Sequence, residues 1–230
     1  MRIIYTQHVP FEDLGAMAPW FRARGIEPGA VRLDLGQALP ESDSFDALIV
    51  MGGPMGVNDN DQYQWLEPER ELIRSAIRNG RHVLGVCLGA QQIAAAMGAR
   101  VYRNAEREIG WFDITSTPQA GSHPLGRALP ARDAVFHWHG DTFDLPNDAV
   151  WLARSDACAH QAFALGDRVL ALQFHLETTV ESATALTVNC ADEMVPAKYV
   201  QSTAQVLSDP QRFEVLNRHM AALLEAWIAA

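Results

Sequence analysis

The sequence has few cysteines and no long apolar run, and these absences exclude several classes of protein. Three cysteines occur in 230 residues, without a CxxC pair, so neither a disulfide framework nor a zinc site is indicated. No stretch approaches the roughly 18 apolar residues of a membrane helix. The N-terminal segment also lacks the long apolar run and small-residue cleavage site of a signal peptide. The reducing cytoplasm is therefore the expected compartment.

Basic residues are scarce as well. The chain has 18 Lys and Arg against 28 Asp and Glu, a net charge of -10, which argues against nucleic acid or an anionic membrane as a partner. It also lacks a GxxxxGK[ST] loop and the serine- and glycine-rich phosphate loop of an ATP-pyrophosphatase. We therefore expect no ATP-driven synthesis by this chain itself.

What is present is an alternation of short apolar runs and amphipathic stretches. The runs are expected to be strands, at residues 2–6, 30–35, 45–51, 82–86, 101–102, 109–115, 134–138, 161–165 and 169–174. Helices are expected at residues 11–25, 67–79, 88–97, 180–188 and 213–228. Continuous apolar runs suit strands covered on both faces. The pattern predicts an α/β fold, a three-layer αβα sandwich of flavodoxin-like kind with a mostly parallel, partly mixed sheet.

The length and composition indicate one domain. A chain of 230 residues, 48% hydrophobic, can bury one sizeable core with little left for a second. We expect a single domain over residues 1–230, with a catalytic core at about 1–190 and a C-terminal helical extension at about 191–230. The vaguest pattern lies at residues 191–211, which are expected to form a loop with a short helix.

The most informative segment is HVLGVCLGAQ, residues 82–91. An apolar strand runs into GVCLG, and a helix follows at once, as in a nucleophile elbow with a thiol in place of a hydroxyl. The glycines allow a sharp turn, and the N-terminus of the helix can lower the pKa of the Cys87 thiol and hold an oxyanion. A buried structural cysteine is the alternative, and the flanking glycines favour the nucleophile.

A thiol nucleophile needs a base that a third group orients. His175 lies in LQFHLE, residues 172–177, at the end of an apolar strand. Carboxyl ends of parallel strands meet at one edge of a sheet, so Cys87 and His175 can converge. Glu177 is two residues beyond His175, and the period of two in extended chain puts both side chains on the same side.

These motifs resemble a known family. The segments GVCLGAQ (85–91) and QFHLE (173–177) look like the paired signature of the class I, triad-type glutamine amidotransferases, and MGGPMG (51–56) looks like their glycine turn. The resemblance covers about residues 1–188 and is nearest in kind to the glutaminase domain of GMP synthase and its free-standing relatives. It implies hydrolysis of a γ-carboxamide through a γ-glutamyl thioester, without cofactor or metal.

The resemblance also assigns roles. Cys87 would attack, His175 would transfer the proton, and Glu177 would orient His175. The backbone N–H groups of Gly53 and Leu88 would form the oxyanion hole.

Further positions would bind the substrate. Gln91, one helical turn after the nucleophile, would contact the amino-acid end, although a plain surface or core-edge glutamine is the alternative. His139, Gly140 and Asp141 match a Ser-His-Gly-Asp run that lines the glutamine site, whereas Trp138 departs from the small residue often found there.

A histidine pair and the two remaining cysteines are not expected to take part in the chemistry. His137 and His139 have the spacing of a metal-ligand pair, but no Cys, Asp or Glu cluster supports it, so no metal is expected. Cys158 and Cys190 lie outside any elbow and are expected to be inert thiols.

Three functions are compatible with these features. The protein could be a glutaminase subunit that delivers ammonia to a separate synthetase. It could instead be a free-standing hydrolase or transferase for small γ-glutamyl compounds. The third function, a non-catalytic binding or regulatory module of the same fold, is disfavoured by the intact set of three chemical groups.

Overall fold

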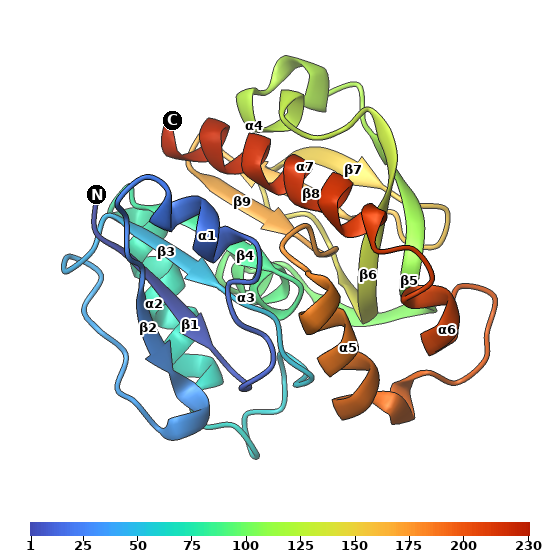
Figure 1. Ribbon diagram of the computed structural model, residues 1–230. Coiled ribbons are helices and arrows are strands. Elements are labelled where there is room, and N and C mark those ends of the chain that lie inside the picture. Colours follow the sequence, from blue (N-terminus) through green and yellow to red (C-terminus); the bar gives the residue numbers. More distant parts are fainter.

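One mixed sheet organises the whole chain, as the computed structural model of residues 1–230 shows (Figure 1). Its nine strands follow the order β2-β1-β3-β4-β9-β8-β7-β5-β6, and the first five are mutually parallel whereas the remaining pairs are antiparallel. The strands are β1 (Ile3–Gln7), β2 (Gly29–Arg32), β3 (Ala47–Val50), β4 (His82–Val86), β5 (Val101–Ser116), β6 (Arg132–Phe143), β7 (Val150–Arg154), β8 (Ala162–Leu165) and β9 (Val169–Leu172). The predicted α/β class with a partly mixed sheet is confirmed.

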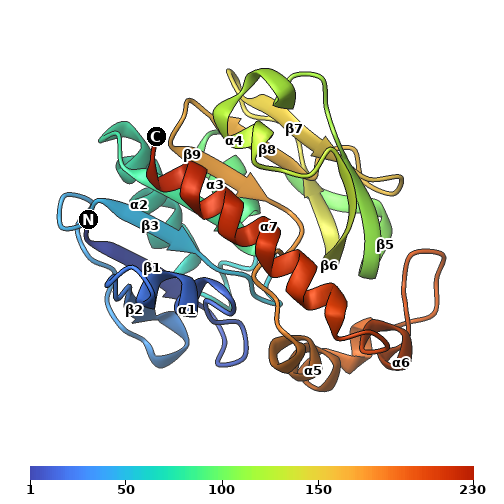
Figure 2. The same ribbon diagram turned by 45° about the horizontal axis from the view of Figure 1, so that its top comes forward.

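Helices cover both faces of this sheet. Helices α1 and α7 lie on one face and α2 and α3 on the other (Figures 1 and 2). The helices are α1 (Met17–Arg22), α2 (Leu66–Arg78), α3 (Leu88–Ala96), α4 (Pro124–Arg127), α5 (Val180–Asn189), α6 (Thr203–Val206) and α7 (Gln211–Ile228), with 3-10 turns at Leu33–Leu35, Ala120–Ser122 and Ala191–Glu193. None of these helices is both long and apolar enough to span a membrane.

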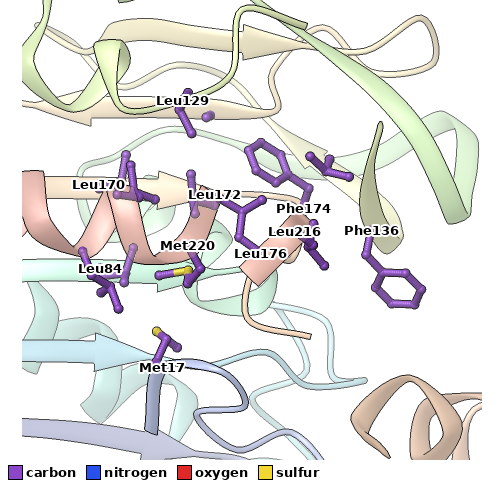
Figure 3. Packing of buried hydrophobic residues seen from close by; sticks show 14 of the residues in the cluster. Met17, Leu84, Leu129, Phe136, Leu170, Leu172, Phe174, Leu176, Leu216 and Met220 are labelled. Atoms are coloured by element: carbon purple, nitrogen blue, oxygen red, sulfur yellow. The ribbon is translucent and has the colours of Figure 1, made fainter. Parts of the chain in front are cut away.

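Alternation along the central strands divides the interior into two clusters. On β9, Leu170 and Leu172 pack beneath α7 (Figure 3), while Val169 and Ala171 belong to the cluster on the side of α2 and α3. Successive side chains of a strand point to opposite faces, so a strand covered on both sides needs an unbroken apolar run. Burial on both faces is therefore why β3 and β9 carry no polar residue.

Helix α7 is the cover over one face of the sheet. Six of its side chains are buried, including Trp227 and also Leu216 and Met220, which Figure 3 shows. The Trp227 indole Nε1 donates to the carbonyl of Arg168 at 2.9 Å, and Asn217 donates to the carbonyls of Leu176 and Thr178. The predicted amphipathic helix is thus observed, and it ties the chain end to the segment after β9.

Several local predictions were wrong. Residues 101–102 and 109–115 belong to one strand, β5, whose register against β6 shifts between Arg103 and Glu108. The charged residues around that bulge hide the strand from any apolar pattern. Strand β7 was not predicted, because its pairing with β5 and β8 defines it rather than its short sequence. Residues 30–35 form a shorter strand followed by a 3-10 turn.

The expected helix at residues 11–25 begins only at Met17. The preceding residues form a loop that docks against the segment after β9, where the Ala16 N–H donates to the carbonyl of Glu177 at 2.8 Å. Gly15 adopts a φ of +48°, and a Cβ there would lie 2.3 Å from the same carbonyl oxygen. This close approach explains why the loop replaces the first turns of the helix.

Candidate active site

Cys87 stands at the sharp turn between β4 and α3. Its backbone has φ 52° and ψ -107°, a left-handed conformation that is rare for a residue with a Cβ. Such strain, held in place by a packed strand and helix, is typical of a nucleophile elbow. The thiol is 7% exposed and its Sγ lies 3.5 Å from the carbonyl oxygen of Trp138.

His175 and Glu177 follow β9, the strand next to β4 in the sheet. Glu177 Oε1 accepts a hydrogen bond from His175 Nδ1 at 2.7 Å, and both side chains are buried. His175 Nε2 has no full hydrogen-bond partner of its own and lies close enough to Cys87 for the two groups to perturb each other's pKa. The structure therefore brings together the three side chains that the motifs single out.

The electrostatics of this cluster favour a proton on the imidazole. Burial raises the pKa of the Cys87 thiol, and the hydrogen bond and charge of His175 offset only part of that rise. Burial acts to lower the pKa of His175, but the charge of Glu177 and the hydrogen bonds with Cys87 and Glu177 outweigh it, so that pKa lies well above 6.5. A proton that leaves the sulfur thus has a stable place on His175.

Gly53 and Leu88 both lie close to Cys87. Leu88 is the first residue of α3, and its N–H points at the sulfur and lowers the pKa of Cys87. Gly53 borders the same cavity, and a Cβ on it would lie 3.2 Å from Leu88 Cδ2. The Gly53 N–H donates no hydrogen bond within the chain. Both donors are therefore available to an oxygen beside Cys87.

The cavity in front of Cys87 has a volume of about 700 Å³. It is bordered by three of the positions predicted to contact the substrate, Gln91, Gly140 and Asp141. Gln91 is 4% exposed and its Nε2 donates to Gln173 Oε1 at 3.1 Å, which leaves its carbonyl oxygen without a partner in the chain.

His139 also borders this cavity, but both of its ring nitrogens contact groups inside the protein. Its Nδ1 faces the carbonyl of Asp141 at 3.0 Å, and its Nε2 lies 3.1 Å from Glu108 Oε2. Since both ring nitrogens are engaged inside the protein, neither is free for a hydrogen bond to a substrate. The geometry favours a structural part for His139, with Gly140 and Asp141 presented next to it.

Comparison with known proteins places this arrangement in a family. A family model, glutamine amidotransferase class-I, matches residues 18–193. The chain belongs to the class I glutamine amidotransferase family. It is 35% identical over 213 residues to YfeJ, a glutamine amidotransferase-like protein of Salmonella typhimurium, and the match covers 90% of this chain and 89% of that protein.

Other relatives of this amidotransferase are known as sequences and as structures. The GMP synthase of Aliivibrio fischeri is 30% identical over 183 residues, which cover 76% of this chain but 34% of that protein. A glutamine amidotransferase structure from Methylobacillus flagellatus superposes with a TM-score of 0.92 at 31% identity, over 99% of this chain and 94% of that one. One from Thermotoga maritima has a TM-score of 0.90 at 30% identity, over 100% and 99%.

A further acid borders the cavity and was not predicted from the sequence. Glu12 lies in the loop before α1, and a Cβ on Gly52 would lie 2.1 Å from Glu12 Oε2 and 3.3 Å from His175 Cε1. Glu12 is thus packed beside the imidazole. Burial, together with the charge of Glu177, raises the pKa of Glu12 from 4.5 to about 7 although the charge of His175 acts to lower it. Only the docking of the loop at Gly15 brings this acid to the site.

The raised pKa of Glu12 predicts a pH-dependent cost to stability. The folded protein retains a proton on Glu12 that the unfolded chain releases between pH 4.5 and 7, so the cost grows through that window and is complete above pH 7. Glu12→Gln is expected to remove it and to gain about 3 kcal/mol relative to wild type on going from pH 4.5 to pH 8. Denaturant unfolding at both pH values measures this. The exposed Glu27→Gln is the control, and an equal pH response of all three proteins would contradict the prediction.

The fold also creates a cluster of two histidines and an acid that was not expected from the sequence. Glu108, His137 and His139 are buried with ligand atoms within 4.8 Å of one another, because Glu108 pairs with His139 across β5 and β6. The expectation that no acid accompanies the histidine pair was therefore wrong. Gln161 Nε2 also donates to Glu108 Oε2 at 2.6 Å, and burial lowers the pKa of His137 to about 4. These groups form a buried polar network centred on Glu108.

Proposed function

We propose that this protein hydrolyses the γ-carboxamide of glutamine, or of another γ-glutamyl compound, through a thioester on Cys87. The observation that carries the proposal is the strained elbow of Cys87 beside the hydrogen-bonded pair of His175 and Glu177. A thiol on such a turn, a base next to it and a carboxylate that orients the base are the groups that acyl transfer requires.

The residues support the following sequence of steps. Cys87 Sγ transfers its proton to His175 and attacks the γ-carbonyl carbon, and the oxyanion that forms accepts from the N–H groups of Gly53 and Leu88. The C–N bond then breaks as His175 protonates the leaving nitrogen, which departs as ammonia. Water, deprotonated by His175, attacks the thioester and releases glutamate, and the thiol regains its proton. Glu177 keeps His175 in the required orientation throughout.

The cavity walls support recognition of an amino-acid end. Asp141 and Gln91 offer oxygen acceptors for an α-ammonium group. Arg103 and Arg107 offer guanidinium groups for an α-carboxylate, since Arg107 Nε and Arg103 Cζ lie 3.4 and 3.6 Å from where a Cβ of Gly140 would be. Neither arginine pairs with a carboxylate side chain within 4 Å. Guanidinium groups suit bidentate binding of carboxylates.

A second candidate is hydrolysis of a γ-glutamyl conjugate larger than glutamine. The volume of about 700 Å³ favours it, because pockets of about 300–1,000 Å³ hold drug-sized ligands and free glutamine is much smaller. In this case the leaving group is an amine rather than ammonia, and no partner is required. For glutamine itself, a separate synthetase subunit that receives the ammonia is the proposed partner.

The proposed unit of function is the whole chain as one domain in the cytoplasm. The packing of α7 on the same cluster as α1 and β9 supports this. Residues 1–190 would carry the chemistry, and residues 191–230 would cover the sheet.

An electrophilic glutamine analogue, such as a chloroketone, tests the proposal. We expect it to alkylate Cys87 and to spare Cys158 and Cys190, because only Cys87 adjoins a base and an anion-stabilising helix terminus. Peptide mapping by mass spectrometry measures the site, and excess glutamine or a γ-glutamyl peptide is expected to protect it. Alkylation at Cys158 or Cys190, with Cys87 unmodified, would refute the assignment.

A further inference from the structure

The strongest unexplained feature near the site is a buried histidine on the far side of the glycine turn. His8 follows β1 and is 1% exposed. Its Nδ1 lies 2.9 Å from the carbonyl oxygen of Gly52, and its Nε2 lies 2.9 Å from Glu69 Oε1 on α2. The ring also stacks on Trp65 at 4.8 Å and 14°. No step of the proposed reaction uses this histidine.

The two partners of His8 fix its charge. A carbonyl oxygen only accepts hydrogen bonds, and so does an ionised carboxylate, so with Glu69 ionised each ring nitrogen of His8 carries a proton. His8 is then an imidazolium paired with Glu69. Burial acts to lower the pKa of His8, but the charge of Glu69 and the hydrogen bonds to Glu69 and Gly52 outweigh it and raise that pKa. Stacking on Trp65 adds a favourable contact for the cation.

The carbonyl that His8 binds belongs to the same peptide unit as the Gly53 N–H. In a trans peptide the C=O and the N–H point in opposite directions. Since the oxygen is directed at His8, the N–H is directed away from it, on the side where Gly53 borders the cavity. That N–H donates to no group in the chain.

We propose that His8 and Glu69 are positioning residues that hold and polarise the Gly52–Gly53 peptide, so that its N–H remains aimed at the oxyanion. This inference rests on the proposed function, in which Gly53 supplies an oxyanion donor. A peptide between two glycines rotates easily, and a fixed partner for its carbonyl prevents that rotation. A cation on the carbonyl oxygen also strengthens the N–H as a donor, because hydrogen bonds in a chain polarise one another.

Two sets of variants separate orientation from charge. In Glu69→Gln the amide can accept from Gln92 and donate to a neutral His8 that still binds Gly52, so only the charge is lost, and kcat is expected to fall about tenfold. The double variant His8→Phe/Glu69→Leu removes the whole pair without leaving a buried charge and keeps a ring on Trp65. Its kcat is expected to fall about 10²- to 10³-fold, with KM nearly unchanged because the interaction exists only in the transition state.

Alkylation of Cys87 by iodoacetamide distinguishes this role from general damage. That displacement forms no oxyanion, so its rate is expected to stay within about twofold in both sets of variants. A matched control is His219→Phe, which removes the His219–Asp133 pair outside the cavity and is expected to leave kcat unchanged. A folded double variant with wild-type kcat, or with an alkylation rate that falls in step with kcat, would overturn the proposal.

The charge of His8 is measured independently of any turnover. Nitrogen-15 NMR of the wild-type ring at pH 8, assigned with His8→Phe, is expected to show two protonated nitrogens, and a neutral tautomer would refute the ion pair. A wild type in which Cys87 resists glutamine-analogue labelling would instead count against the proposed function.

Discussion

Cys87→Ala is expected to lower the rate of γ-amide hydrolysis by about 10⁴- to 10⁶-fold, the loss typical of removing a triad nucleophile. The remaining groups can still bind a substrate and stabilise an oxyanion, but no thioester can form. Release of ammonia from glutamine, and of glutamate from a γ-glutamyl peptide, measures the effect. Alanine keeps the Cβ of cysteine, so the strain of the positive φ at residue 87 is unchanged and the variant is expected to fold as well as wild type.

Cys158→Ala is the matched control, since this thiol is also buried but lies outside the cavity. It is expected to retain wild-type activity. Equal activity of Cys87→Ala and wild type would contradict the proposed chemistry. The same assay separates the two enzyme candidates, because a glutaminase subunit is expected to be slow until its synthetase is added, whereas a free-standing hydrolase is fast alone.

Gly89→Ala is expected to destabilise the protein by about 3 kcal/mol or more. Gly89 lies in the first turn of α3, and a Cβ there would lie 2.0 Å from the carbonyl oxygen of Val50 and 2.7 Å from its carbonyl carbon. These are backbone atoms of β3, a strand held between β1 and β4. Relief therefore requires α3 to move away from the sheet. A drop in Tm of about 6–12 °C would correspond to that loss in a chain of this size.

Activity is expected to fall in Gly89→Ala even at temperatures where the variant is folded. The turn that carries Gly53 follows Val50, and Leu88 directly precedes Gly89. A shift of α3 against β3 therefore changes the distance between the two proposed oxyanion donors. Gly121→Ala is the control, because no atom lies within 4 Å of its Cβ position, and its stability is expected to change by less than about 0.5 kcal/mol. Equal unfolding midpoints of the two variants would contradict the argument.

Local patterns in the sequence were enough to predict the fold class and the candidate triad. The continuous apolar runs predicted strands covered on both faces, and β9 between its two clusters shows why the pattern was reliable. The GVCLG elbow and the spacing of His175 and Glu177 are short-range features. Their geometry follows from a turn of five residues and from the period of two in extended chain, so it can be recognised without knowing the rest of the fold.

Long-range contacts could not be predicted in this way. The bulged strand β5 carries mainly polar residues near Glu108, and only its pairing with β6 brings Glu108 to His139. Glu12 belongs to a stretch with helical spacing, and only docking of its loop on Glu177 places it beside His175. His8 and Glu69 are 61 residues apart, and no pattern within either segment indicates the other.

The sequence by itself determined that this chain is an α/β protein, and it placed a candidate thiol nucleophile, a histidine and a carboxylate in motifs like those of its family, because each of these depends on neighbouring residues. The tertiary structure alone decided that β9 lies beside β4, so that the three groups meet. It also decided which titratable groups lie near them, namely Glu12 and the His8–Glu69 pair, which all lie close to Gly52 or its neighbours. The physical reason is that burial and charge pairing, which set the pKa of each group, arise from contacts between distant segments.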